Sequence, residues 1–402
     1  MEVPRWQQAL FERRNLGVKL GLEAVRAVHA ALGSPAAHIP GLHVVGTNGK
    51  GSTSAMAAHA LQRRGRRVGL YTSPHLHRVG ERVRIAGVAL ADDELQVMCD
   101  RVLAAEGAGP RALTFFEVLT LAALLAFETG GCDAVVLEAG LGGRLDATRI
   151  GRFAATLFTP IALDHTAYLG PTIAAIAGEK AAVMADGAPA WSAPQVPEAA
   201  AVLHRVAREN GVPLVVVEPL ARAPLAGEHQ RVNAALALAG ARVLAPEVVA
   251  DDLEGVVWPG RLERVRVGGG SLVFDVAHNP HGIAALVDHL RATPTSERVV
   301  LFGCLADKDA PAMIATLMAL ECLLWLTPAP GGVAYDVAAL AQGVTQARVF
   351  TGLDDPRLLA ARAQLLARGG ELIVCGSHHV VGHVRGQVLA VAGDARALSD
   401  PR

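Results

Sequence analysis

Short β-branched runs alternate with Ala- and Leu-rich stretches of helical period from about residue 40 onward. The first such units are a strand at LHVVG (42–46), a helix at 52–64 and a strand at VGLYT (68–72). Helices are expected at 92–105 and 115–128, followed by a strand at AVVLEAG (134–140). Strands that alternate with helices in this way predict a parallel sheet covered by helices on both faces.

This pattern is interrupted after Trp258-Pro259-Gly260 by GRLERVRVGGGS, a glycine-rich stretch. Alternation then resumes, with strands at LVFDVA, VVLFG, CLLWLT and ELIVCG and with helices from Pro280, from about Ala310 and after His379. A glycine-rich break between two regular patterns is typical of a domain boundary. We therefore predict an α/β domain over 1–260, a linker at 261–267 and a smaller α/β domain over 268–402.

Composition supports two globular domains and excludes some classes of protein. The chain has 402 residues, more than one hydrophobic core usually holds, with 51% hydrophobic and 19% charged residues and a formal net charge of −1. This balance gives no electrostatic reason to expect nucleic acid or an anionic membrane as a partner. Apolar stretches are broken by Glu117 and Glu321, too soon for a membrane span, and the charged N-terminus lacks the apolar core of a signal peptide.

The five cysteines are scattered and none forms a CxxC pair, so buried reduced thiols are a simpler reading than bridges or metal ligands. We therefore predict a cytoplasmic protein. Nothing in the sequence determines the oligomeric state, and a monomer is the default expectation.

The sharpest local motif is GTNGKGST at 46–53, between a predicted strand and a predicted helix. Glycines let several backbone N–H groups approach phosphate oxygens, and the start of the helix adds its positive end. Lys50 would reach the outer phosphates, and the Ser52 hydroxyl would lie where Mg²⁺ is held. The predicted nucleotide-binding residues of the loop are Thr47, Asn48, Gly49, Lys50, Gly51 and Ser52. The string departs from GxxxxGK[ST], because Val44 replaces the first glycine and Gly51 is inserted. The alternative is a glycine-rich turn with a surface lysine.

At this point the sequence resembles the Mur ligase superfamily, and within it the dihydrofolate synthase and folylpolyglutamate synthase family. The resemblance rests on HVVGTNGKGST, YTSPHL, ERVRIAG, TFFEVLTLAALLAF, LEAGLGGRLDAT, LDHTAYLGPTIAAIAGEKAAVM, EHQRVNAALAL, WPGRLERV, DVAHNPHG, LFGCLADKD and GSHHVVGHV, in family order from about residue 16 to 386. It implies a P-loop ATPase domain with a parallel-sheet core, followed by a smaller Rossmann-like α/β domain. The closest type is the bifunctional one, which adds L-glutamate to dihydropteroate and to the γ-carboxylate of folates.

An amide bond does not form from a carboxylate and an amine in water unless the carboxylate is activated. The resemblance implies activation by ATP through an acyl phosphate, with catalysis by positioning and by charge neutralisation. It assigns Mg²⁺ to Ser73, Glu138 and His165, together with Ser52 of the loop. Imidazole is softer than Mg²⁺ prefers, so His165 is also open to a capping or core role. Lys180 resembles the lysine that this superfamily carbamylates, which would hold a second Mg²⁺; the alternative is a helix-surface lysine paired with a Glu.

The resemblance places Asn233, Arg261 and Asp275 around ATP. Arg261 lies at the domain junction, where we expect it to reach a phosphate when the domains close. His278 and Asn279 follow the first strand of the second domain. Either could touch the phosphoryl group or glutamate, or shape the turn. His278 is a fourth catalytic candidate, beside Lys50, Lys180 and Arg261. His378 and His379 are open between a structural role and a lining of the glutamate site.

On the pterin side the resemblance points to Lys19, Leu20, Gly21 and Leu22, to Thr114, Phe115, Phe116 and Glu117, and to Leu145, Asp146 and Ala147. The two phenylalanines could stack on a pterin ring, and Asp146 or Glu117 could bind its polar edge. A Phe pair at a helix start is also typical of a core. Arg149 departs from the asparagine that is common in the family.

Three rival functions remain at this stage. A cell-wall ligase acting on a UDP-sugar would need an additional N-terminal domain, and only about 45 residues precede the phosphate loop. A folylpolyglutamate synthase without dihydropteroate activity is disfavoured modestly by the KLGL, TFFE and LDA segments. A regulator that has lost catalysis is disfavoured by the presence of every candidate catalytic and metal residue.

Overall fold

The computed structural model describes all residues except 1–3, 18, 20, 296, 345–346 and 392–402. Their contacts divide the chain into two compact units. The first contains residues up to 162, 166–221 and 232–256, and the second contains 163–165, 222–231 and the chain from 257. The main division follows Val256, close to the predicted linker. Two short segments, 163–165 and 222–231, group with the second unit although they precede it in sequence.

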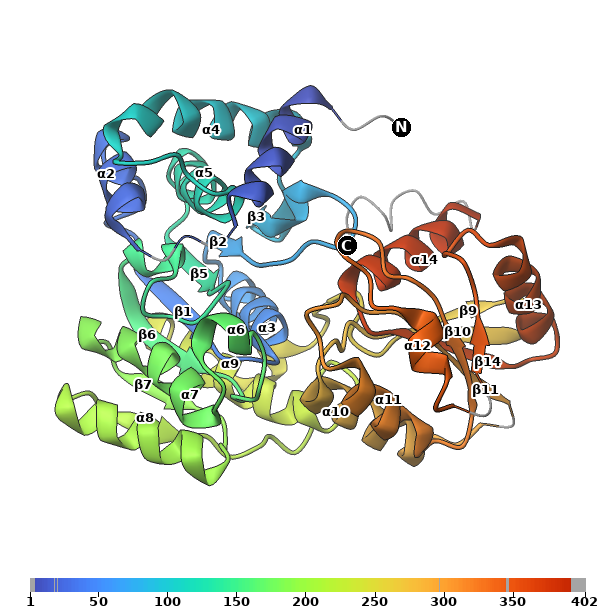
Figure 1. The fold of residues 1–402 in the computed structure, drawn as a ribbon. Helices are drawn as coiled ribbons and strands as arrows, with labels where there is room; N and C mark the ends of the chain where they lie inside the picture. The colour runs from blue at the N-terminus through green and yellow to red at the C-terminus, as the bar shows by residue number, and fades with distance from the viewer. Residues whose placement is uncertain (1–3, 18, 20, 296, 345–346, 392–402) are drawn as a thin grey trace. The chain divides into compact units, whose positions relative to one another are not determined.

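The first unit is built on an eight-stranded sheet of order β4-β3-β2-β5-β1-β6-β7-β8 (Figure 1). Its strands are β1 (Gly41–Val45), β2 (Val68–Tyr71), β3 (Val83–Ile85), β4 (Val88–Ala89), β5 (Ala134–Glu138), β6 (Phe153–Phe158), β7 (Ala190–Ser192) and β8 (Leu214–Val216). The six strands from β2 to β8 in this order are parallel, whereas β3 and β4 pair antiparallel. The central strands β1 and β5 are buried throughout, which explains their unbroken apolar sequences.

Helices account for most of the remaining first unit. They are α1 (Arg5–Glu12), α2 (Glu23–Ala31), α3 (Lys50–Arg63), α4 (Asp92–Ala105), α5 (Phe115–Thr129), α6 (Thr166–Leu169), α7 (Ile173–Ala181), α8 (Pro197–Glu209) and α9 (His229–Leu244), with short 3₁₀ turns between them. One core cluster joins α5 to β2 and β5 through Phe127, Tyr71 and Leu137, and another joins α7 and α8 to β6. Apolar helix faces therefore seal the sheet around its central strands.

The second unit contains a six-stranded sheet of order β13-β12-β11-β14-β10-β9 (Figure 1). Its elements are β9 (Glu263–Val267), β10 (Gly270–Phe274), α10 (Pro280–Ala292), β11 (Arg298–Phe302), α11 (Ala310–Met318), β12 (Leu323–Leu326), α12 (Val337–Ala341), β13 (Ala347–Val349), α13 (Pro356–Ala367), β14 (Glu371–Cys375) and α14 (His378–Val391). All pairs are parallel except β9 with β10. The predicted fold class, a P-loop domain followed by a smaller Rossmann-like α/β domain, is confirmed.

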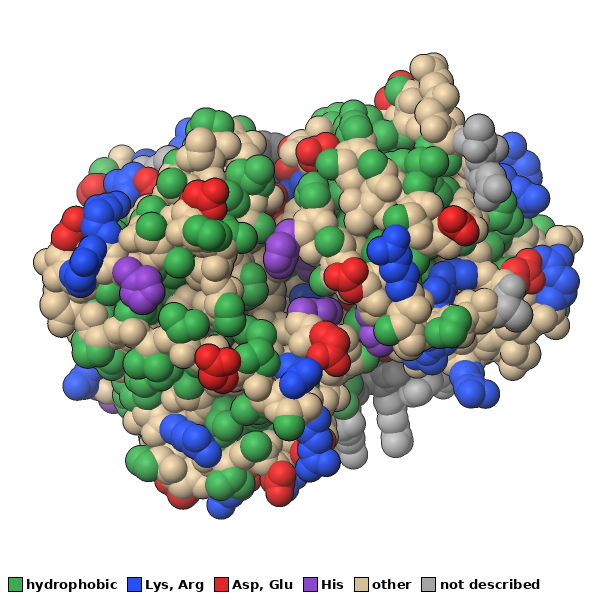
Figure 2. All heavy atoms as spheres, turned by 90° about the horizontal axis from the view of Figure 1, so that it is seen from below, with side chains coloured by type: hydrophobic (Ala, Val, Ile, Leu, Met, Phe, Trp, Pro, Cys, Tyr) green, Lys and Arg blue, Asp and Glu red, His purple; other side chains and the backbone are tan. Residues whose placement is uncertain are grey.

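Acidic and basic side chains are interspersed with hydrophobic ones on the face shown in Figure 2. Among the described residues, no helix combines the length and apolar character needed to cross a membrane. All five cysteines are free thiols, and four of them are buried. Burial raises the pKa of Cys99 and Cys304 to about 12, so these thiols stay protonated at neutral pH.

Candidate active site

The phosphate loop connects the carboxyl end of β1 with the start of α3, as predicted. Gly49 precedes the helix with a φ of +87°, a conformation that favours glycine, and a Cβ there would clash with the Asn233 amide. This close approach brings two predicted nucleotide-binding residues together, one from the loop and one from α9. The N-terminal end of α3 directs its first backbone N–H groups and its positive end toward the loop, which suits a polyphosphate.

The segment that follows β6 supports the phosphate loop. The N–H groups of Thr47 and Asn48 both donate to the Pro160 carbonyl, at 3.0 and 3.3 Å. The Thr47 hydroxyl lies 3.1 Å from both the N–H and the carbonyl oxygen of Ala162. The Lys50 ammonium donates to the Thr47 carbonyl at 3.1 Å, so it lies over the loop rather than on an open surface. Ser52, the predicted metal residue of the loop, is buried.

Glu138 and Ser73 lie side by side because β5 and β2 are parallel neighbours that end at the same edge of the sheet. The Ser73 N–H donates to Glu138 Oε2 at 3.0 Å, and only 4% of Glu138 is exposed. A carboxylate buried this deeply is costly unless it meets a cation. No group of three His, Cys, Asp or Glu side chains within the described ranges is arranged to hold a metal. Mg²⁺ is usually bound by one or two carboxylates with phosphate and water oxygens, so Glu138 with Ser73 fits this ion.

Lys180 projects from the last turn of α7 toward the phosphate loop, where its Nζ donates to the Gly46 carbonyl at 2.7 Å. Only 4% of this residue is exposed. The alternative of a helix-surface lysine is therefore inconsistent with its burial. The neighbouring Glu179 instead pairs with Arg144, whose Nη2 lies 2.9 Å from Glu179 Oε1.

His165 belongs to the three-residue segment that groups with the second unit. Its φ of +52° is unusual for a residue with a side chain, and its side chain is 39% exposed. The His165 N–H donates to the carboxylate of the preceding Asp164 at 2.8 Å. Predicted metal residues thus occur in both units, with His165 in the second and Ser52, Ser73, Glu138 and Lys180 in the first.

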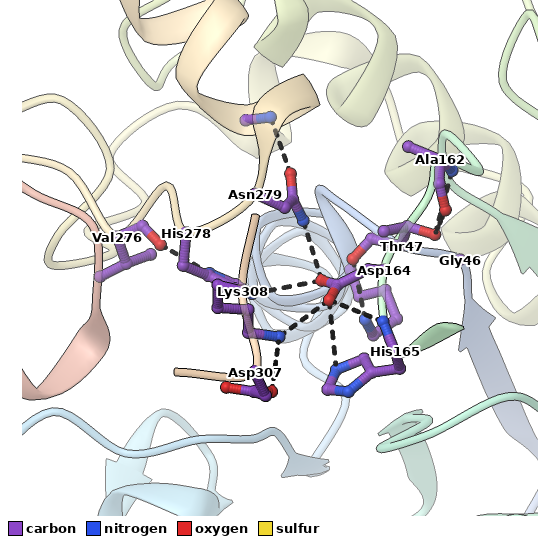
Figure 3. A network of polar contacts seen from close by, with 12 residues as sticks. Gly46, Thr47, Ala162, Asp164, His165, Val276, His278, Asn279, Asp307 and Lys308 are labelled. Carbon is purple, nitrogen blue, oxygen red and sulfur yellow. Dashed lines mark hydrogen bonds and ion pairs between the residues drawn. The ribbon is translucent and has the colours of Figure 1, made fainter. Parts of the chain in front are cut away.

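Asp164 is the centre of a polar network that the sequence did not single out (Figure 3). Its carboxylate accepts from Lys308 Nζ at 2.8 Å and from Asn279 Nδ2 at 2.9 Å, and lies 3.6 Å from His278 Nε2. Burial alone would raise the pKa of Asp164, but the neighbouring His278, His165 and Lys308 side chains hold it far below its usual range. Asp164 therefore gathers two residues of the AHNPH turn and a lysine around one anionic centre.

The AHNPH turn leads from β10 into α10. Asn279 caps the helix, because its Oδ1 accepts from the Gly282 N–H at 2.9 Å. His278 Nδ1 lies 2.8 Å from the Val276 carbonyl, which can only accept, so Nδ1 carries a proton and Nε2 faces Asp164. The His378 ring lies 5.2 Å from that of His278, whereas His379 packs against Gly331. His378 and His379 therefore contact different parts of the second unit.

Arg261 and Asp275 both lie in the second unit, in contrast to Asn233 in the first. The Asp275 carboxylate accepts from the N–H groups of Leu262 and Ala277, at 3.0 and 2.9 Å. It therefore shapes the turns around Arg261 and around the end of β10. The Arg261 guanidinium donates to the carbonyl of Gly260 at 3.1 Å.

The predicted pterin-side residues of α5 have mixed surroundings. Thr114 caps the helix, and Glu117 closes the capping box by accepting from the Thr114 N–H at 2.7 Å. Both Glu117 oxygens also accept from Arg111, at 2.9 and 2.7 Å. Phe115 belongs to the core cluster and lies under two guanidinium groups, of Arg14 and Arg82, at 4.7 and 5.1 Å. Phe116 packs on Tyr71 with a 5.8 Å centroid separation.

The remaining pterin-side candidates lie in two segments. In the first segment, Leu22 is buried at the start of α2 and Gly21 has a φ of +141°. Lys19 is exposed, and Leu20 lies outside the described residues. Leu145 is half-buried, while Asp146 and Ala147 are buried. Arg149, the departure from the family pattern, forms a two-contact ion pair with Asp186 at 2.8 Å and donates to the Arg144 carbonyl at 2.9 Å.

Comparison with known proteins identifies the family of the chain. Residues 44–190 match the Mur ligase middle domain, and residues 260–378 match the Mur ligase glutamate ligase domain. The chain is 34% identical to the dihydrofolate synthase/folylpolyglutamate synthase of Escherichia coli, over 94% of each chain, and 34% identical to that of Bacillus subtilis, over 75% of this chain and 80% of the relative.

Solved structures show the same similarity over nearly the full chain. Escherichia coli FolC in complex with DHPP and ADP superimposes with a TM-score of 0.86 at 32% identity, covering 96% of this chain and 98% of the other. A bifunctional folylpolyglutamate synthase/dihydrofolate synthase with Mn, AMPPNP and L-glutamate bound has a TM-score of 0.84 at 32% identity, with 95% and 98% covered. The family inferred from the motifs is thus confirmed, and the chain belongs to the dihydrofolate synthase/folylpolyglutamate synthase family of Mur ligases.

Proposed function

We propose that this chain ligates L-glutamate to dihydropteroate, giving dihydrofolate, and to the γ-carboxylate of folates, with cleavage of ATP to ADP and phosphate. The single observation that carries the proposal is the contact of Lys180 with Gly46, which joins a buried ammonium to a glycine-rich phosphate loop. It is supported by relatives that carry both activities in their names and by similar structures that contain DHPP with ADP, or AMPPNP with L-glutamate.

The reaction needs the acid's carboxylate to attack the γ-phosphoryl group, and the glutamate amine then to displace phosphate from the acyl phosphate. Lys50 and the start of α3 bind the polyphosphate and stabilise the charge on the transferring group. Arg261 adds a second positive charge to the transferring group. Mg²⁺, when bound at Glu138 and Ser73, neutralises the phosphate oxygens. His278 Nε2 faces Asp164, whose carboxylate also accepts from Asn279 and Lys308. We place the glutamate carboxylates beside this group of amide and positive side chains.

A second Mg²⁺ site, with carbamylated Lys180 as ligand, belongs to this proposal. A carbamate keeps one N–H on Nζ, so the bond to the Gly46 carbonyl is compatible with the modification, while its oxygens would supply the hard ligands that Mg²⁺ prefers. The test is the intact mass in bicarbonate buffer, with and without Mg²⁺. An unmodified mass in both, combined with full activity, contradicts the modification.

One assay separates this function from its rivals. Purified protein is given ATP, Mg²⁺ and labelled glutamate, with dihydropteroate or tetrahydrofolate in separate reactions. Phosphate release and label transfer with both acids identify the bifunctional enzyme, and transfer only to tetrahydrofolate identifies a folylpolyglutamate synthase. No transfer to either acid identifies a nucleotide-binding protein without ligase activity. We retain the cytoplasm and a monomer as proposals, the second to be checked by light scattering.

A further inference from the structure

His43 is a fully buried histidine in the middle of β1, between the parallel strands β5 and β6. Its ring stacks on Phe153 with centroids 4.4 Å apart and planes 10° from parallel. His43 Nε2 lies 2.9 Å from the hydroxyl oxygen of Thr148. A buried imidazole depends on nearby protein groups for its hydrogen bonds, and Thr148 is the partner of His43 Nε2.

Thr148 also forms hydrogen bonds with Asp146. The Thr148 hydroxyl lies 2.5 Å from Asp146 Oδ1, which also accepts from the Thr148 N–H at 3.0 Å. The other oxygen, Oδ2, accepts from the N–H groups of Gly140 and Leu141 at 2.9 and 2.8 Å. Four donors fill the acceptor positions of one buried carboxylate. Through it, His43 is connected to both ends of the loop that follows Glu138.

The number of protons along this chain fixes the tautomer of His43. The Thr148 hydroxyl has one proton, which it donates in its hydrogen bond to the Asp146 carboxylate. In the contact between His43 and Thr148, the proton must therefore be on His43 Nε2. The reverse order would protonate Nδ1, which is buried without a hydrogen-bond partner among the described residues. A buried N–H without an acceptor is costly. Desolvation lowers the pKa of His43 to about 3, against an opposing effect of Asp186 and with a smaller contribution from Arg149, so the ring stays neutral.

We propose that His43 is a positioning residue for the acid site: as an Nε2–H donor it fixes the Thr148 hydroxyl and, through it, the Asp146 carboxylate and the 139–147 loop. The proposal rests on the proposed function, because that loop carries Leu145, Asp146 and Ala147 on the predicted pterin side. The same loop begins directly after Glu138.

Two substitutions separate the hydrogen bond from the ring. His43→Phe keeps an aromatic ring against Phe153 and removes the donor, whereas His43→Gln places an amide N–H near the position of Nε2. We expect His43→Phe to raise KM for the folate acid about tenfold, with KM for ATP changed less than about twofold. His43→Gln should restore most of the loss, and Thr148→Val should add little to His43→Phe in the double variant. Equal changes in both KM values, additive substitutions, or no rescue by glutamine would overturn the proposal.

Phe153→Leu is the matched control, because it removes the stacking partner and leaves the hydrogen-bond chain in place. We expect its KM for the acid to stay within about twofold of the wild type. An effect as large as that of His43→Phe would assign the change to packing and overturn the positioning role.

A measurement on the unmodified protein tests the chain independently of activity. In ¹⁵N-histidine NMR, the His43 ring should show a protonated Nε2 and an unprotonated Nδ1, unchanged from about pH 5 to about pH 8. The opposite tautomer, or a titration in that interval, overturns the proposal. If the wild type binds no folate acid but shows this tautomer, the proposed function fails and the hydrogen-bond chain stands.

Discussion

Lys180 Nζ donates a 2.7 Å hydrogen bond to the carbonyl oxygen of Gly46, the residue that follows β1 and begins the phosphate loop. The two residues are far apart in sequence. They meet because the last turn of α7 lies beside the end of β1. A buried cation at this position contributes positive charge directly beside the predicted polyphosphate site. Two further groups share the site: Lys50 over the loop, and the start of α3.

Lys180→Met keeps the length of the side chain and removes both the charge and the donor. We expect kcat for phosphate release to fall about 100-fold, because charge stabilisation of the transferring phosphoryl group is lost. Lys180→Arg separates two mechanisms, since arginine keeps a donor to Gly46 but is not carbamylated. Activity in the arginine variant supports the ammonium role, and its loss supports the carbamate; wild-type turnover in Lys180→Met contradicts both.

Glu138→Gln tests the magnesium site without disturbing the strand end. Glutamine keeps an oxygen that can accept from the Ser73 N–H, now 3.0 Å from Glu138 Oε2, and removes only the charge. We expect the Mg²⁺ concentration for half-maximal activity to rise at least about tenfold, because a hard cation loses its carboxylate ligand. Glu138→Ala should abolish the remaining Mg²⁺ dependence. A magnesium titration of phosphate release measures both, and an unchanged midpoint in the glutamine variant would remove Glu138 from the metal site.

Much of the fold could be predicted from hydrophobic pattern alone. The helix expected at 92–105 has those bounds in the structure, and the strands that were predicted differ from the observed ones by up to three residues at their ends. The helix after the phosphate loop begins two residues earlier than predicted, at Lys50, because Gly49 in its left-handed conformation provides the N-cap. Local propensity determines such elements, whereas cap geometry decides where they begin.

The site was less predictable where it depends on contacts between distant segments. The sequence indicated Asp164 and Lys308 only as members of the motifs LDH and DKD. No local pattern indicates that these two residues pair across 144 positions. His43 has the appearance of an ordinary strand residue, because its role depends on Thr148, 105 positions away. Phe115 is mainly a core residue, the alternative that its helix-start position left open. Side-chain partners of this kind follow from topology, which periodicity does not encode.

The pair of Asp164 and Lys308 gives a prediction on stability. Their side chains are 8% and 10% exposed, so removing Lys308 leaves a buried carboxylate without its shortest ionic contact. We expect Lys308→Met to lower the free energy of unfolding by about 3 kcal/mol, as measured by urea denaturation. Asp307→Asn is the control, because Asp307 is 59% exposed and lies 3.5 Å from the same ammonium. It should change the free energy of unfolding by less than about 0.5 kcal/mol.

The same pair predicts a dependence on pH. The pKa of Asp164 is lowered in the folded protein, so its contribution to stability is present above the unfolded-state pKa of about 4 and is lost as pH falls below it. Unfolding free energies measured between about pH 6 and about pH 3 should therefore fall less steeply in Asp164→Asn than in the wild type. Parallel curves for the two proteins would show that Asp164 does not contribute.

Arg385 supports the segment that carries Arg261. The Arg385 side chain is only 4% exposed and donates from Nε and Nη2 to the Glu263 carboxylate at 2.9 to 3.0 Å. Glu263 Oε2 in turn accepts from the Gly260 N–H at 2.9 Å, and the Gly260 carbonyl accepts from the Val276 N–H at 3.0 Å. Helix α14 thereby holds the turn immediately before Arg261.

Arg385→Met should release this turn and lower kcat between about tenfold and about 100-fold, because a catalytic charge that is misplaced by about 1 Å loses much of its effect. Arg385→Lys keeps one donor to Glu263 and should recover part of the activity. Arg362→Met is the matched control: Arg362 donates to Gln387 of the same helix at 2.7 Å but has no contact with Glu263 among the hydrogen bonds of the described residues. Steady-state phosphate release at saturating ATP measures all three variants. If Arg362→Met and Arg385→Met lose activity equally, the effect comes from α14 as a whole, and Arg385 does not act through the turn at Gly260.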